Sequence, residues 1–436
     1  MKGLEPRDRR ASAAMDGFAR RASGRVLDEN APQPHRQLPR SLVFTMAVAA
    51  ALAVANVYYA QPLLAAIAGT YGIRHEELGI VITTSQVGYG VGLLLVVPLG
   101  DLLDRRRLLV AQLLAAAVAL LTIAAAPTAS VLMIGMVAVG LLSVVTQILV
   151  AYAASLASPD ERGRIVGFVT SGIVLGILLA RTIAGIVADI AGWRSVYLAA
   201  TVAITLTAMV LFRLLPHREL FKPRLSYWNL VGSVFRLWAH EPVLRARGAI
   251  GFFIFASVTT LWTPLALPLS APPFSLSYTE IGLFGLAGAA GAVAAARAGA
   301  WADRGRADSA TLLVLLTMIL AWVPIALLPW SLIALLIGVV AIDFGLQATH
   351  VLNQALIFQI RPEARSRLAA AYMLFYAAGC AAGAAVTTFV YARTGWNGVC
   401  VVGVMLNLCA LLVWVLTRQS PRCAQAIFRG SNHEQR

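Results

Sequence analysis

Charged residues are scarce in this 436-residue chain. Asp, Glu, Lys and Arg together make up 13% of it, against about a quarter in soluble domains, whereas hydrophobic residues make up 59%. A soluble globular protein needs more charge than this to cover its surface. The composition therefore excludes the soluble classes and indicates a chain that lies mostly within a lipid bilayer.

Cysteine is also rare, and motifs for catalysis or metal binding are missing. The four cysteines have no metal-ligand spacing, and three of them lie in apolar stretches where cysteine packs like a small hydrophobe: Cys380, Cys400, Cys409 and Cys423. The chain has no nucleotide-binding loop of the Walker type and no nucleophile elbow. We therefore expect no enzyme activity, no metal and no cofactor. Any transport must then draw on an ion gradient or on the gradient of the solute itself.

Long apolar runs recur along the whole chain, each close to the roughly 20 residues that a helix needs to cross a membrane. Twelve spans are predicted: 42–66, 78–99, 108–126, 131–156, 165–188, 195–214, 247–269, 279–300, 309–329, 331–358, 368–391 and 395–417. The sequence thus predicts an all-α membrane protein with twelve transmembrane helices.

Basic residues are distributed unevenly between the two sides that these spans create. If residue 1 is cytoplasmic, 31 of the 35 Lys and Arg residues fall on the cytoplasmic side, counting those at the cytoplasmic ends of spans, while Arg74, Arg194 and Arg393 lie outside and Arg181 lies deep within a span. Cytoplasmic loops of membrane proteins carry such an excess. We therefore expect both termini on the cytoplasmic side of a bacterial inner membrane. The net charge of +15 then reflects topology and not nucleic-acid binding.

The N-terminal tail, residues 1–40, is basic and contains Pro32, Pro34 and Pro39. It has no apolar core before Ser41 and so does not read as a secretory signal. We expect this tail to be disordered and to lie near anionic lipid.

Three short sequence patterns occur a second time, 202 or 203 residues further along the chain. Residues 158–164, SPDERGR, return as RPEARSR 203 residues later, and the Gly-Trp pair at 192–193 returns at 395–396 with the same offset. Asp101 has its counterpart in Asp303, 202 residues later. Each pair falls in an equivalent loop, which indicates duplication of one unit. We therefore expect two pseudo-symmetric six-helix bundles, 41–214 and 247–417, with a cytoplasmic linker at 215–246 and a cytoplasmic tail at 418–436.

Two such repeats flanking a central site are the arrangement of the major facilitator superfamily, and a loop motif supports the resemblance. The stretch VPLGDLLDRRRLL at 97–109 is similar to that superfamily's signature of Gly, Asp and paired basic residues. One register puts Asp101 on the signature Asp, and a competing register uses Asp104; Arg105 and Arg106 supply the basic pair. The second copy contains Gly299, Asp303 and Arg304.

The resemblance implies that these two loops form a conformational latch. Carboxylates and guanidinium groups at helix ends pair across the two bundles in one conformation only, and breaking the pairs changes which side is open. The alternative is that the arginines only set the topology.

The fifth predicted helix resembles the superfamily's antiporter motif. Small residues three to five positions apart let helices approach closely and form a pivot between the bundles, and the motif residues are Gly167, Gly176, Ala180, Ala184 and Gly185. Arg181 stands where the signature has proline. The chain as a whole, over about 41–417, resembles bacterial drug:proton antiporter-like exporters.

The tenth predicted helix carries a polar stripe in an apolar setting. Asp343, Gln347, His350 and Gln354 recur at helical spacing on one face. Asp343 lies about twelve residues from the outer end of its span, near mid-membrane at 1.5 Å per residue. Burial disfavours the charged carboxylate, so Asp343 is a candidate proton carrier. The alternatives are a permanent ion pair or a hydrogen-bonded structural carboxylic acid. Whether Arg181 pairs with Asp343 stays open.

Further polar residues complete the predicted pathway. His350 is a candidate proton relay or a hydrogen-bonded structural residue, and Gln147 on the fourth helix is the pseudo-symmetric neighbour of Gln347. On the first helix, Asn56 and Tyr59 share a face, and Gln61 and Pro62 follow where the helix can bend. These residues line the pathway or form an interfacial aromatic belt. Trp262 on the seventh helix, between Thr259 and Thr263, is the matching candidate from the second bundle.

Taken together, these features predict a secondary active transporter that works as a monomer and exports small organic molecules in exchange for protons. A proton-coupled importer or a uniporter on the same fold is the alternative. A membrane sensor without transport activity is a more remote one.

The charge distribution predicts the topology. A reporter that is active only in the cytoplasm should be active when fused after Arg40, within 215–246 or after Arg418, and inactive when inserted at 270–277. The reason is the division of basic residues, 31 on one side against three on the other. Loss of reporter activity within 215–246 would contradict both the even number of spans and the two-bundle interpretation.

Overall fold

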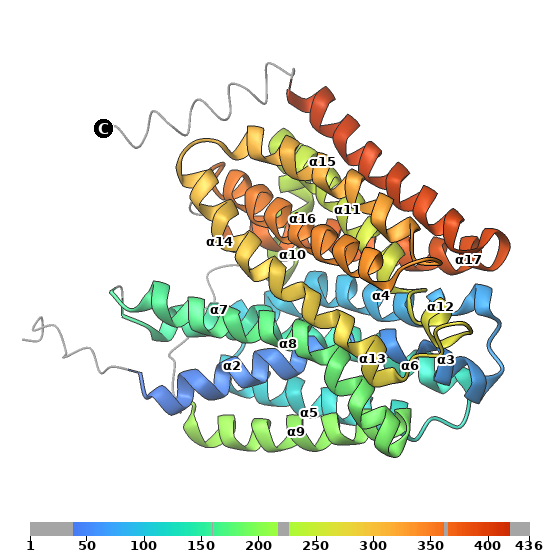
Figure 1. Cartoon of the computed structure of the whole chain (residues 1–436). Helices are drawn as coiled ribbons and strands as arrows, with labels where there is room; N and C mark the ends of the chain where they lie inside the picture. Colours follow the sequence, from blue (N-terminus) through green and yellow to red (C-terminus); the bar gives the residue numbers. More distant parts are fainter. Residues whose placement is uncertain (1–37, 159, 217–225, 362–364, 419–436) are drawn as a thin grey trace, which may run out of the picture. The chain divides into compact units, whose positions relative to one another are not determined.

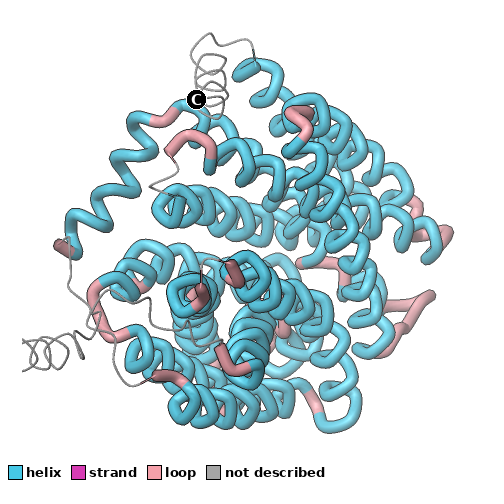
Figure 2. Tube along the Cα trace, turned by 90° about the vertical axis from the view of Figure 1, so that its left-hand side faces the viewer, coloured by secondary structure: helices cyan, strands magenta, loops and turns pink. Residues whose placement is uncertain are grey.

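The computed structural model describes residues 38–158, 160–216, 226–361 and 365–418 of the chain (Figure 1). Residues Pro39–Arg436 belong to one compact unit. Three predicted segments lie wholly or partly outside the described residues: the N-terminal tail up to residue 37, the linker at 217–225, and the C-terminal tail after 418. The described residues form helices, short turns and loops, and no strand is present among them (Figure 2).

Every predicted span falls on helix. The α-helices are α2 (Arg40–Ala55), α3 (Ala60–Tyr71), α4 (Gly79–Leu95), α5 (Arg105–Ala124), α6 (Ala129–Ser143), α7 (Val145–Leu156), α8 (Arg162–Ala191), α9 (Trp193–Leu214), α10 (Tyr227–His240), α11 (Pro242–Trp262), α12 (Ala266–Ser270), α13 (Tyr278–Leu283), α14 (Ala289–Asp303), α15 (Ala307–Ala326), α16 (Leu332–Phe358) and α17 (Arg365–Arg418). Short 3₁₀ segments are η1 (His75–Glu77), η2 (Val97–Asp101) and η3 (Phe284–Gly288). Helix is the expected form because lipid offers no partners to open backbone N–H and C=O groups.

Nine helices of the described chain are long and apolar enough to cross a membrane, or ten when the bent pair α2 and α3 is taken as one span. Two predicted spans merge in α17, whose helical path breaks at Gly395, where φ is 67°. A further predicted span, 279–300, is divided into α13, η3 and α14. The linker is not loop throughout, because it contains the helix α10, and α11 begins at Pro242, five residues before the predicted start of the seventh span.

The first and seventh predicted spans break at equivalent places. α2 and α3 are bent by 42° across residues 56–59, just before Pro62, and α11 ends just before Pro264. Proline cannot donate a backbone hydrogen bond and clashes with the carbonyl one turn earlier, so each helix is interrupted there. Gln61-Pro62-Leu63 corresponds to Thr263-Pro264-Leu265 at an offset of 202, which matches the repeat seen in the loops. The residues at both breaks are largely buried, among them Asn56, Gln61 and Thr263.

The two predicted bundles meet tightly at the end of the molecule that holds the turns 72–78, 192 and 271–277, here called the closed end. The Thr182 hydroxyl donates to the carbonyl of Gly282 at 2.9 Å, and a Cβ added at Gly185 would collide with the carbonyl of Tyr278. Asp189 accepts the backbone N–H groups of Tyr278 (3.1 Å) and Thr279 (2.7 Å) at the start of α13. A carboxylate at a helix N-terminus is favourable because the first N–H groups have no partner within the helix.

A second contact at the closed end joins α4 to α17. The hydroxyl of Thr388 accepts the backbone N–H of Gly79 at 3.0 Å and donates to the carbonyl of Glu76 at 3.0 Å. A Cβ at Gly79 would collide with the carbonyl of Ala384. Small residues therefore allow the two bundles to touch backbone to backbone, as in close helix pairs in membranes.

The opposite end of the molecule holds the turns 102–104, 304–306 and 359–361 and is here called the arginine-rich end. There, α10 contacts both bundles. The Tyr227 hydroxyl donates to the carbonyl of Leu95 at 2.9 Å, and Trp238 Nε1 donates to the carbonyl of Ala371 at 3.1 Å. Helix α10 therefore fastens the end of α4 to the start of α17.

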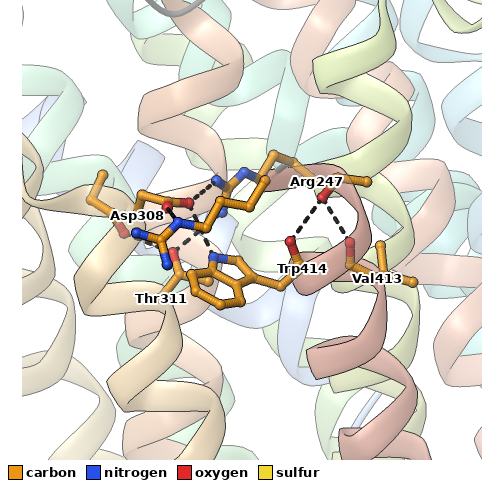
Figure 3. Close-up of polar contacts among 8 residues, drawn as sticks. Arg247, Asp308, Thr311, Val413 and Trp414 are labelled. Atoms are coloured by element: carbon orange, nitrogen blue, oxygen red, sulfur yellow. Dashed lines mark hydrogen bonds and ion pairs between the residues drawn. The ribbon is translucent and has the colours of Figure 1, made fainter. Parts of the chain in front are cut away.

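An ion cluster at the arginine-rich end holds three helices of the second bundle together (Figure 3). Arg247 of α11 pairs with Asp308 of α15 at 2.8 Å, and Trp414 Nε1 of α17 donates to the same carboxylate oxygen at 3.0 Å. Arg418 lies 3.3 Å from the other oxygen and over the ring of Trp414. Asp308 does not stand out from the sequence alone, because it lies just before the span predicted at 309–329 and its partners are far away in sequence.

The closed end provides the first structural prediction. Gly185→Val should shift the protein toward a state open at this end, because the added methyl groups meet the Tyr278 backbone. Overpacking costs about 1–3 kcal/mol, so the shift is about fivefold or more. It can be measured as thiol-reagent labelling, from the closed-end side, of a cysteine placed at Gln61 in a variant without native cysteines. The matched control is Gly167→Val on the same helix, where a Cβ meets nothing within 4 Å. Equal labelling of the two variants would contradict the prediction.

The ion cluster provides a stability prediction. Asp308→Asn keeps the side-chain shape and can still accept from Trp414, but removes the negative charge that faces the buried Arg247. Because Asp308 is partly exposed, we expect a loss of about 1–3 kcal/mol in the free energy of unfolding. Thermal unfolding in detergent measures it, with Asp160→Asn at an exposed turn as the control, expected within about 0.5 kcal/mol of the unmodified protein. Equal unfolding temperatures for the two variants would argue against the cluster as a stabilising element.

Candidate functional site

A buried guanidinium, that of Arg181, contacts side chains of both predicted bundles. Arg181 of α8 is 6% exposed, and its Nε donates to Gln61 Oε1 on α3 at 2.6 Å. The guanidinium carbon lies 3.9 Å from the centroid of the Trp262 ring and 5.1 Å from that of Tyr58. The broken first helix and the end of α11 thus supply one hydrogen bond and two aromatic faces. Aromatic faces attract cations, most strongly where water is excluded.

Asp343 of α16 is the carboxylate of this site. It is 7% exposed, and Trp262 Nε1 donates to its Oδ1 at 3.3 Å. No N–O contact within 4.0 Å joins Arg181 and Asp343 among the ion pairs of the described residues. The two charges are instead connected through Trp262, which offers its ring face to Arg181 and its N–H to Asp343. The structure therefore brings Arg181 and Asp343 to one aromatic side chain without pairing them directly.

A pair of tyrosines extends the cluster toward α17. The hydroxyls of Tyr58 and Tyr376 lie 3.0 Å apart, and the rings of Tyr376 and Tyr89 pack edge to face at 5.8 Å between centroids. Gln147 Nε2 donates to the Tyr89 hydroxyl at 3.4 Å. A chain of contacts, two hydrogen bonds and two ring contacts, thus leads from Arg181 through three tyrosines to Gln147 on α7.

The space beside Arg181 is small. A cavity of about 10 Å³, room for about one water molecule, is lined by Gln61, Pro62, Arg181, Trp262, Leu265, Ala266 and Ile281. Its walls come from both broken helices and from α8 and α13. Movement of any of them changes the space around the guanidinium.

In the described part of the chain, the other polar residues of the stripe on α16 contact different neighbours and do not join the site around Arg181. Gln347 is half-buried beside Gly291, where a Cβ would collide with its side chain. His350 Nδ1 lies 3.3 Å from the hydroxyl of Tyr372, and its ring packs edge to face against Phe255. His350 has no polar contact with Asp343 among the described residues. The stripe is therefore continuous along the helix but does not form one hydrogen-bonded chain.

The first helix differs in detail from the sequence analysis. Tyr59 packs edge to face against Tyr197, with centroids 6.4 Å apart, and the neighbouring Tyr58 is the residue that reaches Arg181. Asn56 is 1% exposed, and neither atom of its amide has a hydrogen-bond partner among the described residues. Sequence analysis did not single out Tyr58 or Tyr376. Helical phase alone could not assign the faces of residues 56–59, because the helix is broken there.

The predicted pivot on α8 makes close contacts on two sides. A Cβ at Gly176 would collide with the carbonyl of Ala51 on α2, and one at Gly185 with that of Tyr278 on α13. Ala180 and Ala184 are buried, whereas a Cβ at Gly167 would meet nothing within 4 Å. Gly172, which the motif does not include, faces the carbonyl of Ala47 as Gly176 faces that of Ala51.

The predicted latch is described in part. Asp104 accepts the backbone N–H of Arg107 at 2.8 Å and so caps α5. Arg105 donates to the Ser155 hydroxyl at 2.8 Å, and Arg106 donates to the carbonyl of Phe212. These contacts join helices within the first bundle. The side chains of Asp101 and Asp303 lie outside the described part of the structure. Arg304 is exposed, and a Cβ added at Gly299 would meet nothing within 4 Å. The latch between the bundles stays a prediction.

The described residues contain no group of three or more His, Cys, Asp or Glu side chains that could hold a metal ion. The chemistry available at the centre is therefore ionic, aromatic and hydrogen-bonding. One carboxylate and one guanidinium, both removed from water, are its charged groups. Such groups inside a membrane bundle mark pathways for ions and substrates.

Comparison with known proteins agrees with this arrangement. Residues 46–360 match the Major Facilitator Superfamily model. The chain is 44% identical over 382 residues to the uncharacterized transporter YgaY of Escherichia coli O157:H7, covering 88% of this chain and 97% of the relative. It is 33% identical over 387 residues to a transporter of Streptomyces coelicolor, covering 86% of each chain.

A solved structure has the same fold. The bacterial homologue of the human lysosomal transporter Spinster, in its inward-facing and unoccupied conformation, aligns with a TM-score of 0.69 at 14% identity, covering 92% of this chain and 98% of that one. The helical fold, the family match and the named relatives lead to one conclusion. The chain belongs to the major facilitator superfamily and is a multi-pass membrane transporter.

Proposed function

We propose that this transporter exports small organic molecules from the cytoplasm in exchange for protons, by alternating access, with Asp343 as the proton-carrying group. The observation that carries the proposal is the connection of Asp343 to Arg181 through Trp262 at the junction of the two predicted bundles. The proposal places the protein in a bacterial inner membrane, with both termini in the cytoplasm and a single chain as the functional unit.

The coupling follows from the electrostatics of the site. A buried carboxylate favours its ionised form when a guanidinium is near, and binds a proton when that charge moves away. Arg181 and Asp343 stand on α8 and α16, one in each predicted bundle, so a rearrangement of the bundles changes their separation. A proton bound in one conformation is then released in the other, which is what exchange of solute for protons needs.

The contacts of the closed end supply the two-state element. Opening this end would separate Asp189 from the N–H groups of Tyr278 and Thr279, and would part Gly185 from the α13 backbone. These contacts lie on the same two helical segments, α8 and α13, that border Arg181. Separation of α8 from α13 would therefore open the closed end and change the surroundings of Arg181 at the same time.

The substrate site includes the ring faces and the polar groups around Arg181. Tyr58, Trp262 and Tyr376 offer aromatic surface, and Gln61 and Asn56 offer amide groups. Both amide atoms of Asn56 lack partners among the described residues, so a bound solute or water can satisfy them without breaking an existing hydrogen bond. Small organic molecules with an apolar body and a few polar groups suit such a surface.

The test is transport by purified protein in vesicles under an imposed pH gradient. Asp343→Asn should abolish uphill accumulation of solute, a loss of at least about tenfold, while downhill exchange of solute persists, because Asn keeps the shape but cannot carry the proton. Asp343→Glu should restore part of the uphill transport. The matched control is Asp160→Asn, an exposed carboxylate at the arginine-rich end.

Proton-driven accumulation in Asp343→Asn with the unmodified pH profile would remove Asp343 from the mechanism. Accumulation in the direction of proton entry would identify an importer and refute export. If the unmodified protein transports solute at a rate that does not depend on the pH gradient, it is a uniporter.

A further inference from the structure

A cavity of about 300 Å³ lies at the arginine-rich end, between α10 and the start of α17, away from the central site. Its walls come from three segments: the last two turns of α10 with the residue that follows it, the turn three residues after the end of α16, and the first turn of α17. The lining residues are Ser233, Arg236, Leu237, His240, Glu241, Arg361 and Arg367.

The lining carries more positive charge than its carboxylate can balance. Glu241 pairs with Arg361 at 2.7 Å. Arg236 donates to the backbone carbonyl of Asn229 at 3.2 Å, and no ion pair to Arg236 or Arg367 occurs among the described residues. Among the described residues, the guanidinium groups of Arg236 and Arg367 therefore line the cavity without a carboxylate partner. Ser233 donates its hydroxyl to the carbonyl of Leu230, so it presents only an acceptor and a small surface.

Guanidinium groups from different elements suit one ligand chemistry best. Each presents a planar fork of N–H donors that matches two oxygens of a phosphoryl group, and two of them balance its charge. His240 shares its Nδ1 with the carbonyl of Arg236, which leaves its other ring nitrogen for a ligand. The volume, about 300 Å³, is at the lower limit for small-molecule sites and exceeds what a bare phosphate ion needs. We propose that this cavity binds the phosphoryl group of a phosphate ester, either a phospholipid headgroup or a soluble organic phosphate.

A role in topology alone does not account for the arrangement. Setting the orientation of a membrane protein requires only that arginines follow the spans on one side. It does not require residues from α10, from the turn after α16 and from α17 to surround one cavity. The convergence of the three segments, with Leu237 as an apolar wall, is the feature that indicates a binding site.

The outer surface of α10 favours a lipid as the source of the phosphoryl group. Trp228 is 72% exposed and Phe235 is 48% exposed, and seven residues apart they lie on one edge of the helix. Arg236 and His240 lie on the adjoining exposed edge, and Val231, Val234 and Leu237 on the buried face. Helices with exposed aromatic residues beside basic ones lie in the membrane interface. Basic pockets beside such helices bind anionic headgroups.

Occupancy of the cavity has a structural consequence. Helix α10 already contacts α4 through Tyr227 and α17 through Trp238. A ligand held by Arg236 and Arg367 would add a further connection between α10 and α17. The linker between the two predicted bundles would then be held more firmly against the second one.

The experiment compares the full-length protein in nanodiscs of phosphatidylcholine alone with nanodiscs that also contain phosphatidylglycerol. Retained lipid is measured by native mass spectrometry, and glycerol 3-phosphate is the soluble probe, measured by calorimetry in the phosphatidylcholine discs. The test variant is Arg236→Gln with Arg367→Gln. The control, Arg213→Gln with Arg306→Gln, removes the same charge from exposed positions at the same end of the bundle.

If the lipid is the ligand, retention of phosphatidylglycerol falls about tenfold or more in the test variant and not in the control. If the ligand is soluble, glycerol 3-phosphate binds in phosphatidylcholine discs and its affinity falls by a similar factor. Equal retention by the two variants, with no binding of glycerol 3-phosphate, overturns the proposal. Should the test variant fail to insert, Ser233→Leu fills the cavity without changing its charge and should give the same loss.

Discussion

The central constraint on this structure is the presence of a guanidinium group in a membrane bundle. Arg181 cannot lose its proton, and it has lost nearly all contact with water, so the surrounding helices must compensate for the desolvation. One hydrogen bond, which Arg181 donates to Gln61, and the ring faces of Trp262 and Tyr58 do so. Tyr58 lies within the break of the first predicted span, Gln61 follows that break, and Trp262 is the last residue before the break of the seventh.

The same constraint explains why glycines cluster around α8. Arg181 can be enclosed only if the neighbouring backbones come close to it, and a Cβ at Gly282 or Gly285 would crowd Arg181 itself. Gly176 and Gly185 place α2 and α13 against the same helix on other sides. Close backbone packing without side chains between the helices permits two discrete arrangements better than interlocked large residues do. The site for charge and the contact that must open are therefore built from one helix.

The arginine-rich end is organised differently, because its contacts depend on long side chains and not on backbone approach. Arg247, Asp308 and Trp414 unite three helices of the second bundle, so this part of the protein behaves as one body. Helix α10 contacts both bundles through single hydrogen bonds from Tyr227 and Trp238, which can break and re-form at low cost. In the proposed alternating-access mechanism, these few contacts of α10 would have to change when one bundle moves against the other.

The amino-acid sequence by itself determined the helices, the internal repeat and the polar residues worth considering, because hydrophobic length and local motifs are properties of contiguous segments. Asp343, Arg181 and Trp262 were identified in this way. Only the tertiary structure decided that Trp262 stands between the two charges, that Tyr58 and not Tyr59 faces Arg181, and that Asp308 is the centre of an ion cluster. Each of these depends on the rotation and separation of helices far apart in the chain, which are set by packing among many side chains and not by any one segment.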